Sequence, residues 1–382
     1  MTTAIFVIVL TGALVAAACA LLGSFLVLRR MAMLADAISH AILPGIVAGY
    51  FFAQGPNLLA GFAGAALAAA VTVAVVEALQ NTRRVGGESA IGIVFPAMFA
   101  LGTFFVSKYF ANVHLDTDAV LYGNIEFAAF DVLIINGVNW GPQSLWVLGA
   151  LCVVNLLFVV LFFKELKLAT FDPGLAAALG FSPALIHYAL MTMVSITAVG
   201  AFTAVGAVLV VAFMIVPAAT AYLLTDDLRR MIAIAVGVGI LSAAGGFVVA
   251  FIFDASVAGA MATMAGICFL LALLFSPSHG LVTRFKRLRR QRMRLAMENL
   301  VVHLLNHEHV AYEEHEAEVD HLSSELRWQT GFARRVIGLA QRAQLVRLTD
   351  GHLALTDAGR ELARRAAATT VEPSSDLLAA SP

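Results

Sequence analysis

Long apolar segments recur along the first 280 residues of this chain, and they constrain its fold more than any other feature. A helix needs about 20 apolar residues to cross the roughly 30 Å hydrocarbon core of a bilayer. Candidate segments lie at 4–28, 32–53, 57–79, 89–107, 144–163, 184–224, 231–253 and 258–276. The segment 184–224 is too long for one crossing, and we expect it to divide near residues 200–203. The sequence therefore predicts an all-α polytopic membrane protein with nine spanning helices, or eight if 184–224 forms one long broken helix.

The distribution of charge marks a second region after residue 280. Hydrophobic residues make up 60% of the chain and charged residues 13%, and the mean hydropathy is +0.89. Only 9 of the 24 lysines and arginines lie in residues 1–280. We predict a transmembrane domain over 1–280, a basic juxtamembrane linker over 281–296, a cytoplasmic domain over 297–368 and a disordered tail over 369–382. The three cysteines lie apart in apolar segments, which indicates neither a disulfide framework nor a zinc finger.

Basic residues between the spans predict the orientation, because Lys and Arg concentrate in cytoplasmic loops. With nine spans, the basic groups that share one side are Arg29/Arg30, Arg83/Arg84, Lys164/Lys167, Arg229/Arg230 and the cluster 284–294. Lys108 falls on the other side, at the start of an acidic segment over 108–142. We therefore expect an external N-terminus and a cytoplasmic C-terminus.

An aspartate and a histidine lie four residues apart inside the second apolar segment. Asp36 and His40 would project from one face of a helix. A charged side chain at the bilayer centre costs about 2.5–3.5 kcal/mol on insertion scales, so such groups usually mark an ion path. Carboxylate and imidazole suit a divalent first-row metal. We predict Asp36 and His40 as metal ligands, with Ser39 orienting His40 by a hydrogen bond. The alternative is a structural polar pair that bridges helices without metal.

Pro44 and Gly45 follow His40 by one turn. Broken helices are tolerated in membranes where they line a cavity. We therefore predict a kink at Pro44-Gly45 that lets the helix flex during gating.

A polar segment between the fifth and sixth spans predicts a short capped helix on the cytoplasmic side. Asp172-Pro173 is typical of a helix N-cap followed by proline at the first helical position. The helix would cover Gly174–Leu179 and end at Gly180. Such a helix either offers a rigid contact to another protein or serves only as an interfacial connector.

Over residues 5–280 the chain resembles the permeases of ABC importers for manganese, zinc and iron. The resemblance is carried by residues 28–31 (LRRM), 36–41 (DAISHA) with Pro44-Gly45, 121–125 (LYGNI), 171–180 and 205–221. It implies a two-fold dimer with a second permease chain, identical or paralogous, a pair of ABC ATPase subunits, and an extracytoplasmic metal-binding lipoprotein. It also implies that the segment 165–180 couples to the ATPase, through Glu165, Asp172, Pro173, Ala177 and Gly180.

Such a dimer would bring two carboxylates and two imidazoles together at its axis. Mixed oxygen and nitrogen donors favour Mn²⁺, Fe²⁺ or Zn²⁺ over Ca²⁺ and Mg²⁺. The resemblance of the segment Ala41–Gly45 favours manganese or iron, with zinc close, as transported ions and with no permanently bound cofactor. The chain has no Walker A motif, so we expect ATP hydrolysis by a separate partner and no enzyme activity here. The resemblance implies the inner membrane of a bacterial cell.

The pattern over 297–368 predicts a winged helix-turn-helix. Helical periods at 299–307, 318–326 and 331–344 precede an alternating segment around Asp350-Gly351, which is a strong hairpin signal. A last helix is expected over 357–365. Residues 355–360 (LTDAGR) are similar to the segment after the wing in iron-dependent, DtxR-type repressors.

Three roles stay open for this tail: metal sensing, DNA binding, or packing against the ATPase. The candidate regulatory metal ligands are His303, His307, His309 and His315. The candidate DNA contacts are Arg334, Arg335 and Arg342. Eight arginines against thirteen acidic residues over 297–382 argue against strong DNA binding.

The leading prediction for the whole chain is an ABC permease for a divalent transition metal. One alternative is a non-ABC divalent metal transporter, which would need no ATPase. Another is a membrane-anchored, metal-responsive regulator. The regulator predicts that deletion of 297–382 abolishes function while Asp36→Ala does not.

Overall fold

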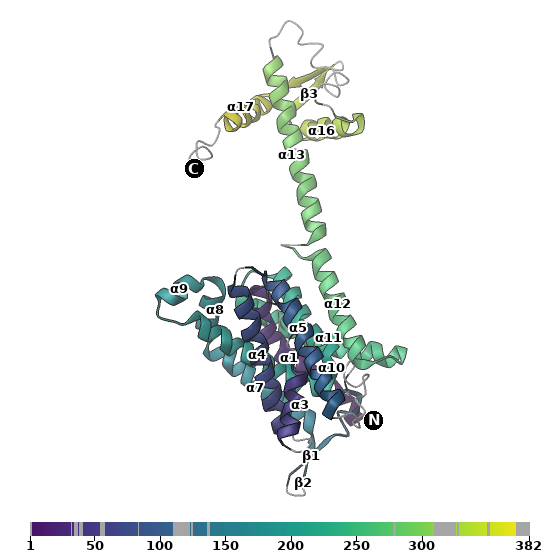
Figure 1. Cartoon of the computed structure of the whole chain (residues 1–382). Helices are drawn as coiled ribbons and strands as arrows, with labels where there is room; N and C mark the ends of the chain where they lie inside the picture. The colour runs from purple at the N-terminus through teal and green to yellow at the C-terminus, as the bar shows by residue number, and fades with distance from the viewer. Residues whose placement is uncertain are drawn as a thin grey trace. The chain divides into compact units, whose positions relative to one another are not determined.

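The computed structural model describes residues 2–31, 33, 37, 41–53, 58–82, 84–109, 123, 125–135, 138–277, 280–308, 326, 328–349 and 352–371. The chain divides into two compact units, Met1–Leu281 and Val282–Pro382. We call them the membrane unit and the C-terminal unit and describe each by itself (Figure 1).

The membrane unit is built almost entirely from helices. They are α1 (Thr2–Leu28), α3 (Leu43–Phe52), α4 (Leu58–Asn81), α5 (Gly87–Tyr109), η1 (Ile125–Phe127), α7 (Gln143–Leu161), α8 (Phe163–Phe171), α9 (Pro173–Ala178), α10 (Pro183–Leu224), α11 (Leu228–Phe253) and α12 (Val257–Phe275). A short antiparallel hairpin, β1 (Val132–Ile135) and β2 (Val138–Pro142), precedes α7. No pattern in the sequence had indicated this hairpin.

Eight helical segments in the described part are long and apolar enough to cross a membrane, which confirms the all-α membrane fold. Two of them come from α10, whose backbone breaks at Gly206 with φ +78° and ψ 168°. The candidate spans divide where the sequence predicted, between Phe202 and Ala204. The backbone break itself lies a few residues further along, at Gly206, because glycine tolerates this positive φ. α3 is too short to span a bilayer alone, and residues 34–36 and 38–40 before it lie outside the described part. The ninth span therefore stays a prediction.

Small residues let the helices of the membrane unit touch through their backbones. A Cβ atom on Gly23 of α1 would lie 1.8 Å from the carbonyl oxygen of Met214 in α10. A Cβ on Gly246 of α11 would lie 2.3 Å from Cα of Met261 in α12. Close backbone approach of this kind is how helices gain packing energy where lipid offers no hydrophobic drive.

One buried polar side chain joins three helices of the membrane unit. Asn155 of α7 donates from Nδ2 to the Ala18 carbonyl of α1 at 3.1 Å and to Thr197 Oγ1 of α10 at 2.8 Å. Its side chain is 1% exposed. The hydrogen bonds satisfy an amide that would otherwise be costly to bury.

The C-terminal unit contains α13 (Leu281–His307), α16 (Thr330–Arg342), the hairpin β3 (Val346–Thr349) and β4 (His352–Leu355), and α17 (Asp357–Val371). The hairpin pairs Val346 with Leu355 and Thr349 with His352. Buried Leu300, Val301 and Val336 contribute to a hydrophobic core of its own. The predicted basic linker is helical and continuous with the predicted helix 299–307. The predicted helix 318–326 lies outside the described residues except Leu326.

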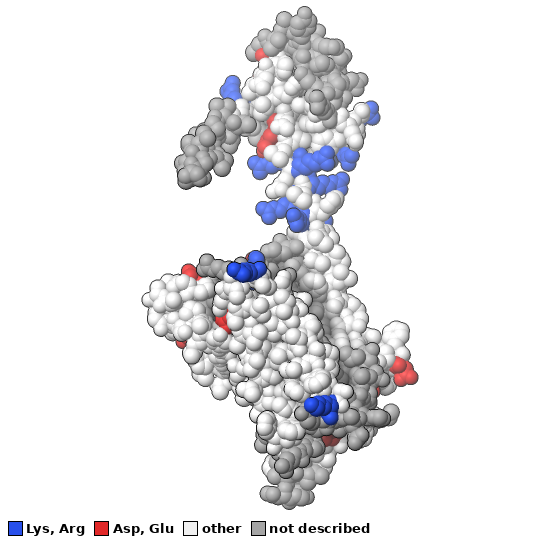
Figure 2. Space-filling model, viewed as in Figure 1, with Lys and Arg blue, Asp and Glu red and all other residues white. Residues whose placement is uncertain are grey.

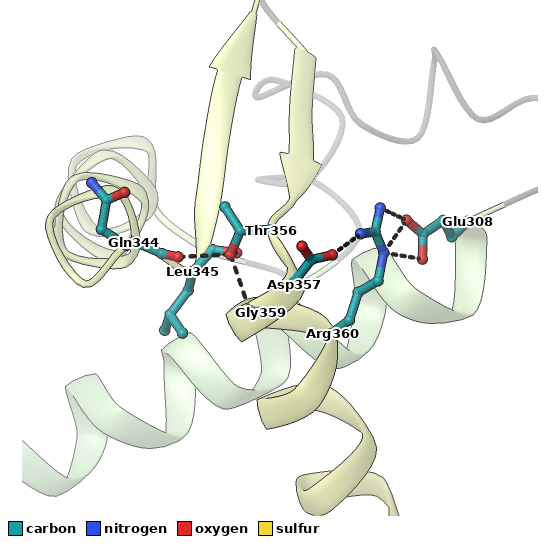
Figure 3. A network of polar contacts seen from close by, with 7 residues as sticks. All are labelled: Glu308, Gln344, Leu345, Thr356, Asp357, Gly359 and Arg360. Carbon is teal, nitrogen blue, oxygen red and sulfur yellow. Dashed lines mark hydrogen bonds and ion pairs between the residues drawn. The ribbon is translucent and has the colours of Figure 1, made fainter.

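Polar contacts fasten α17 to the rest of this core (Figure 3). The Thr356 hydroxyl donates to the carbonyl oxygens of Gln344 and Leu345, at 2.6 Å and 3.0 Å, and accepts from the Gly359 N–H. Arg360 pairs with Glu308, the residue after α13, at 2.7 Å. The hydrogen bond to Glu308 raises the pKa of Arg360 above its ordinary value.

Candidate metal path and its two ends

The predicted metal ligands Asp36 and His40, with Ser39 beside them, lie outside the described residues. Their geometry therefore stays a prediction. The described neighbours are helical and buried: Ala37 is 2% exposed and Ala41 is 0% exposed. Among the residues that the structure does describe, no group of three or more His, Cys, Asp or Glu could hold a metal.

The segment directly after His40 is held by backbone contacts. Pro44 lies in the first turn of α3, where its missing N–H costs no helical hydrogen bond. It therefore helps to begin α3 and does not kink it internally; a role in gating stays a prediction. A Cβ on Gly45 would lie 2.1 Å from the Gly64 carbonyl oxygen of α4, and a Cβ on Gly102 of α5 would lie 2.9 Å from Pro44 Cδ. These close contacts with α4 and α5 fix the position of Pro44 and Gly45, which directly follow the predicted metal site in the chain.

At one end of the membrane unit, Gly123 meets the break in α10. Gly123 has φ +71°, and a Cβ there would lie 2.3 Å from the Gly206 backbone nitrogen. Ile125 is buried, and Glu126 accepts a hydrogen bond from the Val257 N–H at the start of α12. The break in α10 is thus covered by a segment about eighty residues earlier in the chain.

A cavity of about 340 Å³ lies beside this covered break. Its lining includes Asp131, Gln143 and Ser144 together with Gly200 and Ala204 of α10. The Ser144 hydroxyl is buried and has no hydrogen-bond partner among the described residues. The cavity therefore has both polar and apolar lining residues at this end of the unit.

At the other end of the membrane unit, charged side chains form contacts between the ends of different helices. Arg29, directly after α1, donates from Nε to Thr170 Oγ1 of α8 at 3.0 Å. Burial lowers the pKa of Arg29. Glu77 of α4 accepts a hydrogen bond from the Tyr188 hydroxyl of α10. The Arg229 guanidinium at the start of α11 lies 5.4 Å from the Phe163 ring centroid.

These contacts were not predicted from sequence. The signal that could have found them is a charged residue at the end of an apolar helix, which needs a partner or water. Through the hydrogen bond of Arg29 to Thr170, α8 is linked directly to the chain just before residues 32–40.

The predicted short helix is present as α9, next to α8. Asp172 caps it, with its carboxylate accepting from the Leu175 N–H at 2.9 Å, and Pro173 begins it. Gly180 follows with φ +88°, the left-handed conformation that commonly ends a helix. Ala177 and Gly180 are exposed, whereas Glu165 is half-buried in α8. Phe171, Leu175 and Leu179 leave a patch of exposed apolar surface at this tip.

The candidate residues of the C-terminal unit are only partly described. His303 and His307 share a face of α13, with ring centroids 4.5 Å apart. His309 and His315 lie outside the described residues. Arg334, Arg335 and Arg342 are exposed on α16.

Eight candidate spans among the described residues are typical of a multi-pass membrane protein. Residues 1–276 match the model of the ABC 3 transport family. The chain belongs to this family. It is a membrane permease subunit of an ABC transport system and not an enzyme.

The chain is similar to individual members over most of their length. It is 46% identical over 358 residues to the zinc transport system membrane protein TroD of Treponema pallidum, covering 94% of this chain and 97% of that one. It is 45% identical to the manganese transport system membrane protein MntD of Bacillus subtilis, covering 72% and 94%. Among solved structures, PsaBC from Streptococcus pneumoniae in complex with Fab matches with a TM-score of 0.61 and 27% identity, covering 74% and 94%.

The similarity to TroD reaches into the C-terminal unit. An alignment of 358 residues is longer than the membrane unit, which ends at Leu281. The match to MntD, at 277 residues, is about as long as the membrane unit alone. A second unit is thus a feature that this chain shares with some relatives and not with others.

Proposed function

We propose that this permease carries a divalent transition metal into the cytoplasm, with manganese or iron favoured and zinc close. The observation that carries the proposal is the family match over 1–276, because it covers the whole membrane unit. Relatives with this membrane unit are named for zinc, manganese and iron transport. Asp36 and His40 supply the donor types that such ions prefer.

The metal site in this proposal forms between two permease chains, identical or paralogous. Two copies of Asp36 and His40 would surround the ion, and Ser39 would orient His40. A bound dication would offset the cost of burying two carboxylates in the membrane. The close packing of Pro44 and Gly45 against α4 and α5 supports the proposed metal site, because it fixes the position of the chain one turn after His40.

The proposed orientation has the C-terminus in the cytoplasm. Arg29, Arg229 and the segment with Lys164 lie at the same end, since Arg29 contacts α8 and Arg229 contacts Phe163. Gathering of basic residues at one end agrees with the positive-inside rule. The opposite end, with Asp131 and its cavity, would then receive the metal from an extracytoplasmic lipoprotein.

The ATPase pair would bind α8 and α9. This proposal predicts that Leu175→Asp prevents the ATPase subunit from copurifying with the permease, because it places a charge in the exposed apolar patch of α9. The matched control is Leu348→Asp in the C-terminal unit, since the two leucines are 47% and 44% exposed. Equal copurification of the ATPase with both variants would contradict the docking site.

The C-terminal unit is proposed to be a winged helix, with α16 as the second helix of the motif and β3–β4 as the wing. Its hairpin and flanking helices support this reading of the fold. Whether it senses metal, binds DNA or packs on the ATPase decides between a transporter with an added module and a metal-responsive regulator.

Cellular uptake of radioactive manganese, iron and zinc separates the three functions. In the permease proposal, Asp36→Ala and His40→Ala abolish uptake, omission of the ATPase abolishes it, and removal of residues 297–382 preserves it. Asp226→Ala, an acidic residue in the loop before α11, is the matched control. Uptake without the ATPase would indicate a non-ABC transporter. Loss of function on truncation alone, with Asp36→Ala active, would indicate the regulator.

A further inference from the structure

A cluster of positive charge lines a groove between α13 and α16 of the C-terminal unit. The groove has a volume of about 610 Å³. Its cationic lining consists of Lys286, Arg289, Arg290, Arg334, Arg335 and Arg342. Met293, Gly338 and Leu339 complete it. Figure 2 shows blue Lys and Arg atoms gathered in the region of α13 and α16.

The cations face one another from two helices. Lys286, Arg289 and Arg290 follow helical spacing on α13, and Arg335 and Arg342 do so on α16. All six side chains are exposed. Among the residues that the structure describes, no carboxylate lines the groove. Like charges gathered in this way repel one another unless an anion joins them.

The neighbouring surface of α13 is apolar and exposed. Leu281, Phe285, Leu288 and Leu295 recur at helical spacing and form a stripe, and Phe285 is 68% exposed. An apolar stripe beside a dense row of cations is typical of helices that lie in the lipid headgroup layer.

The groove also lies close to the bilayer along the chain. Lys286 follows Phe275, the last residue of α12, by eleven residues. Eleven residues span at most roughly 40 Å even when fully extended. Acidic membrane surfaces attract basic segments only within about a Debye length, so direct docking is needed for the attraction to act.

We propose that this groove binds the phosphate headgroups of anionic phospholipids and so docks the C-terminal unit on the membrane surface. The exposed stripe of α13 inserts between the headgroups beside it. Lipid is favoured over nucleic acid as the ligand, because an exposed apolar stripe lies beside the cations and lipid is always present next to α12. In the cell this surface would be the inner leaflet, and only that assignment rests on the proposed cytoplasmic orientation.

Short-range fluorescence quenching tests the docking. The full chain, with Cys19, Cys152 and Cys268 replaced by alanine, is labelled at Thr330→Cys and placed in nanodiscs with a spin label on a lipid headgroup. We expect strong quenching in discs that contain phosphatidylglycerol and little in pure phosphatidylcholine. High salt should reverse it. Both leaflets carry the same lipids, so the result depends neither on orientation in the cell nor on transport.

A matched pair of variants assigns the effect to the groove. Replacing Arg334, Arg335 and Arg342 together by glutamine should lower the ratio of docked to undocked chains roughly tenfold or more. Replacing Arg364 and Arg365 of α17 by glutamine should leave it unchanged. Both sets are exposed, and circular dichroism would verify folding. Quenching that ignores lipid charge, or that survives the groove variant, overturns the proposal. So does groove-dependent binding of a fluorescent DNA duplex in phosphatidylcholine discs, which would make nucleic acid the ligand.

Discussion

The membrane unit and the C-terminal unit are stabilised in different ways. In the membrane unit, glycines such as Gly23 and Gly45 bring helix backbones into contact. In the C-terminal unit, large side chains such as Leu300 and Val336 fill a core that water encloses. Moving an apolar side chain from lipid into the protein gains little hydrophobic free energy, so packing and polar contacts must hold the membrane helices together. Moving apolar surface out of water gains about 25 cal/mol per Å². Adding an atom should therefore destabilise the membrane unit most, whereas removing atoms should destabilise the C-terminal unit most.

The largest effect should come from adding one methyl group beside the predicted metal site. Gly45→Ala places Cβ 2.1 Å from the Gly64 carbonyl oxygen, and a backbone atom cannot move aside cheaply. We expect a loss of about 3 kcal/mol and a clear drop in the melting temperature of the detergent-solubilised protein. Gly149→Ala in α7 is the control, because its Cβ meets nothing within 4 Å. Equal melting temperatures for the two variants would show that α3 and α4 are not in backbone contact.

A deletion in the soluble core should have a comparable but confined effect. Leu300→Ala removes a side chain that is 0% exposed and should destabilise the C-terminal unit by about 3 kcal/mol. Limited proteolysis should then cut near α16 while metal uptake persists. Leu348→Ala, at an exposed position of β3, should change neither the proteolysis pattern nor metal uptake. A simultaneous loss of uptake with Leu300→Ala would mean that the two units depend on each other.

Loss of a single hydroxyl should have a smaller effect in the same unit. Thr356→Val removes the contacts to Gln344, Leu345 and Gly359 and should cost about 1 kcal/mol. Thr356→Ser keeps the hydroxyl and serves as the control. Faster amide exchange in the first turn of α17 is the expected signal for valine alone. Faster exchange in the serine variant as well would assign the effect to lost packing of the methyl group.

The smallest effect should come from the buried amide of the membrane unit. Asn155→Leu removes hydrogen bonds to Ala18 and Thr197, and such bonds in membranes contribute about 0.6 kcal/mol on average. A double-mutant cycle with Thr197→Val, read by melting temperature, isolates the pair. A coupling as large as the loss in Gly45→Ala would reverse the ranking of packing over polar contacts.

Features set by neighbouring residues could be predicted from the sequence. The spans follow from apolar length, and α9 follows from Asp172, Pro173 and Gly180, which lie within one short segment. The break in α10 could be placed only to within a few residues. Several residues near 200–206 could have broken the helix, and the choice of Gly206 depends on its contact with Gly123, far away in sequence.

In the candidate site, too, local features could be predicted from the sequence and contacts between distant segments could not. The residue types and spacing of Asp36 and His40 predict a metal, but the seat of Gly45 on Gly64 and the bond from Arg29 to Thr170 join distant segments. The groove between α13 and α16 was missed for a similar reason. The sequence placed these cations in a basic linker and among the candidate DNA contacts separately, and only the fold brings them together.

Direct metal binding tests the central claim. The full chain is purified in nanodiscs as wild type, Asp36→Ala, His40→Ala and the control Asp226→Ala, and bound manganese and zinc are measured by equilibrium dialysis. The account predicts that wild type and Asp226→Ala bind metal, and that both site variants lose it while keeping the wild-type melting temperature. Undiminished binding by Asp36→Ala and His40→Ala would contradict the claim that these residues form the metal path.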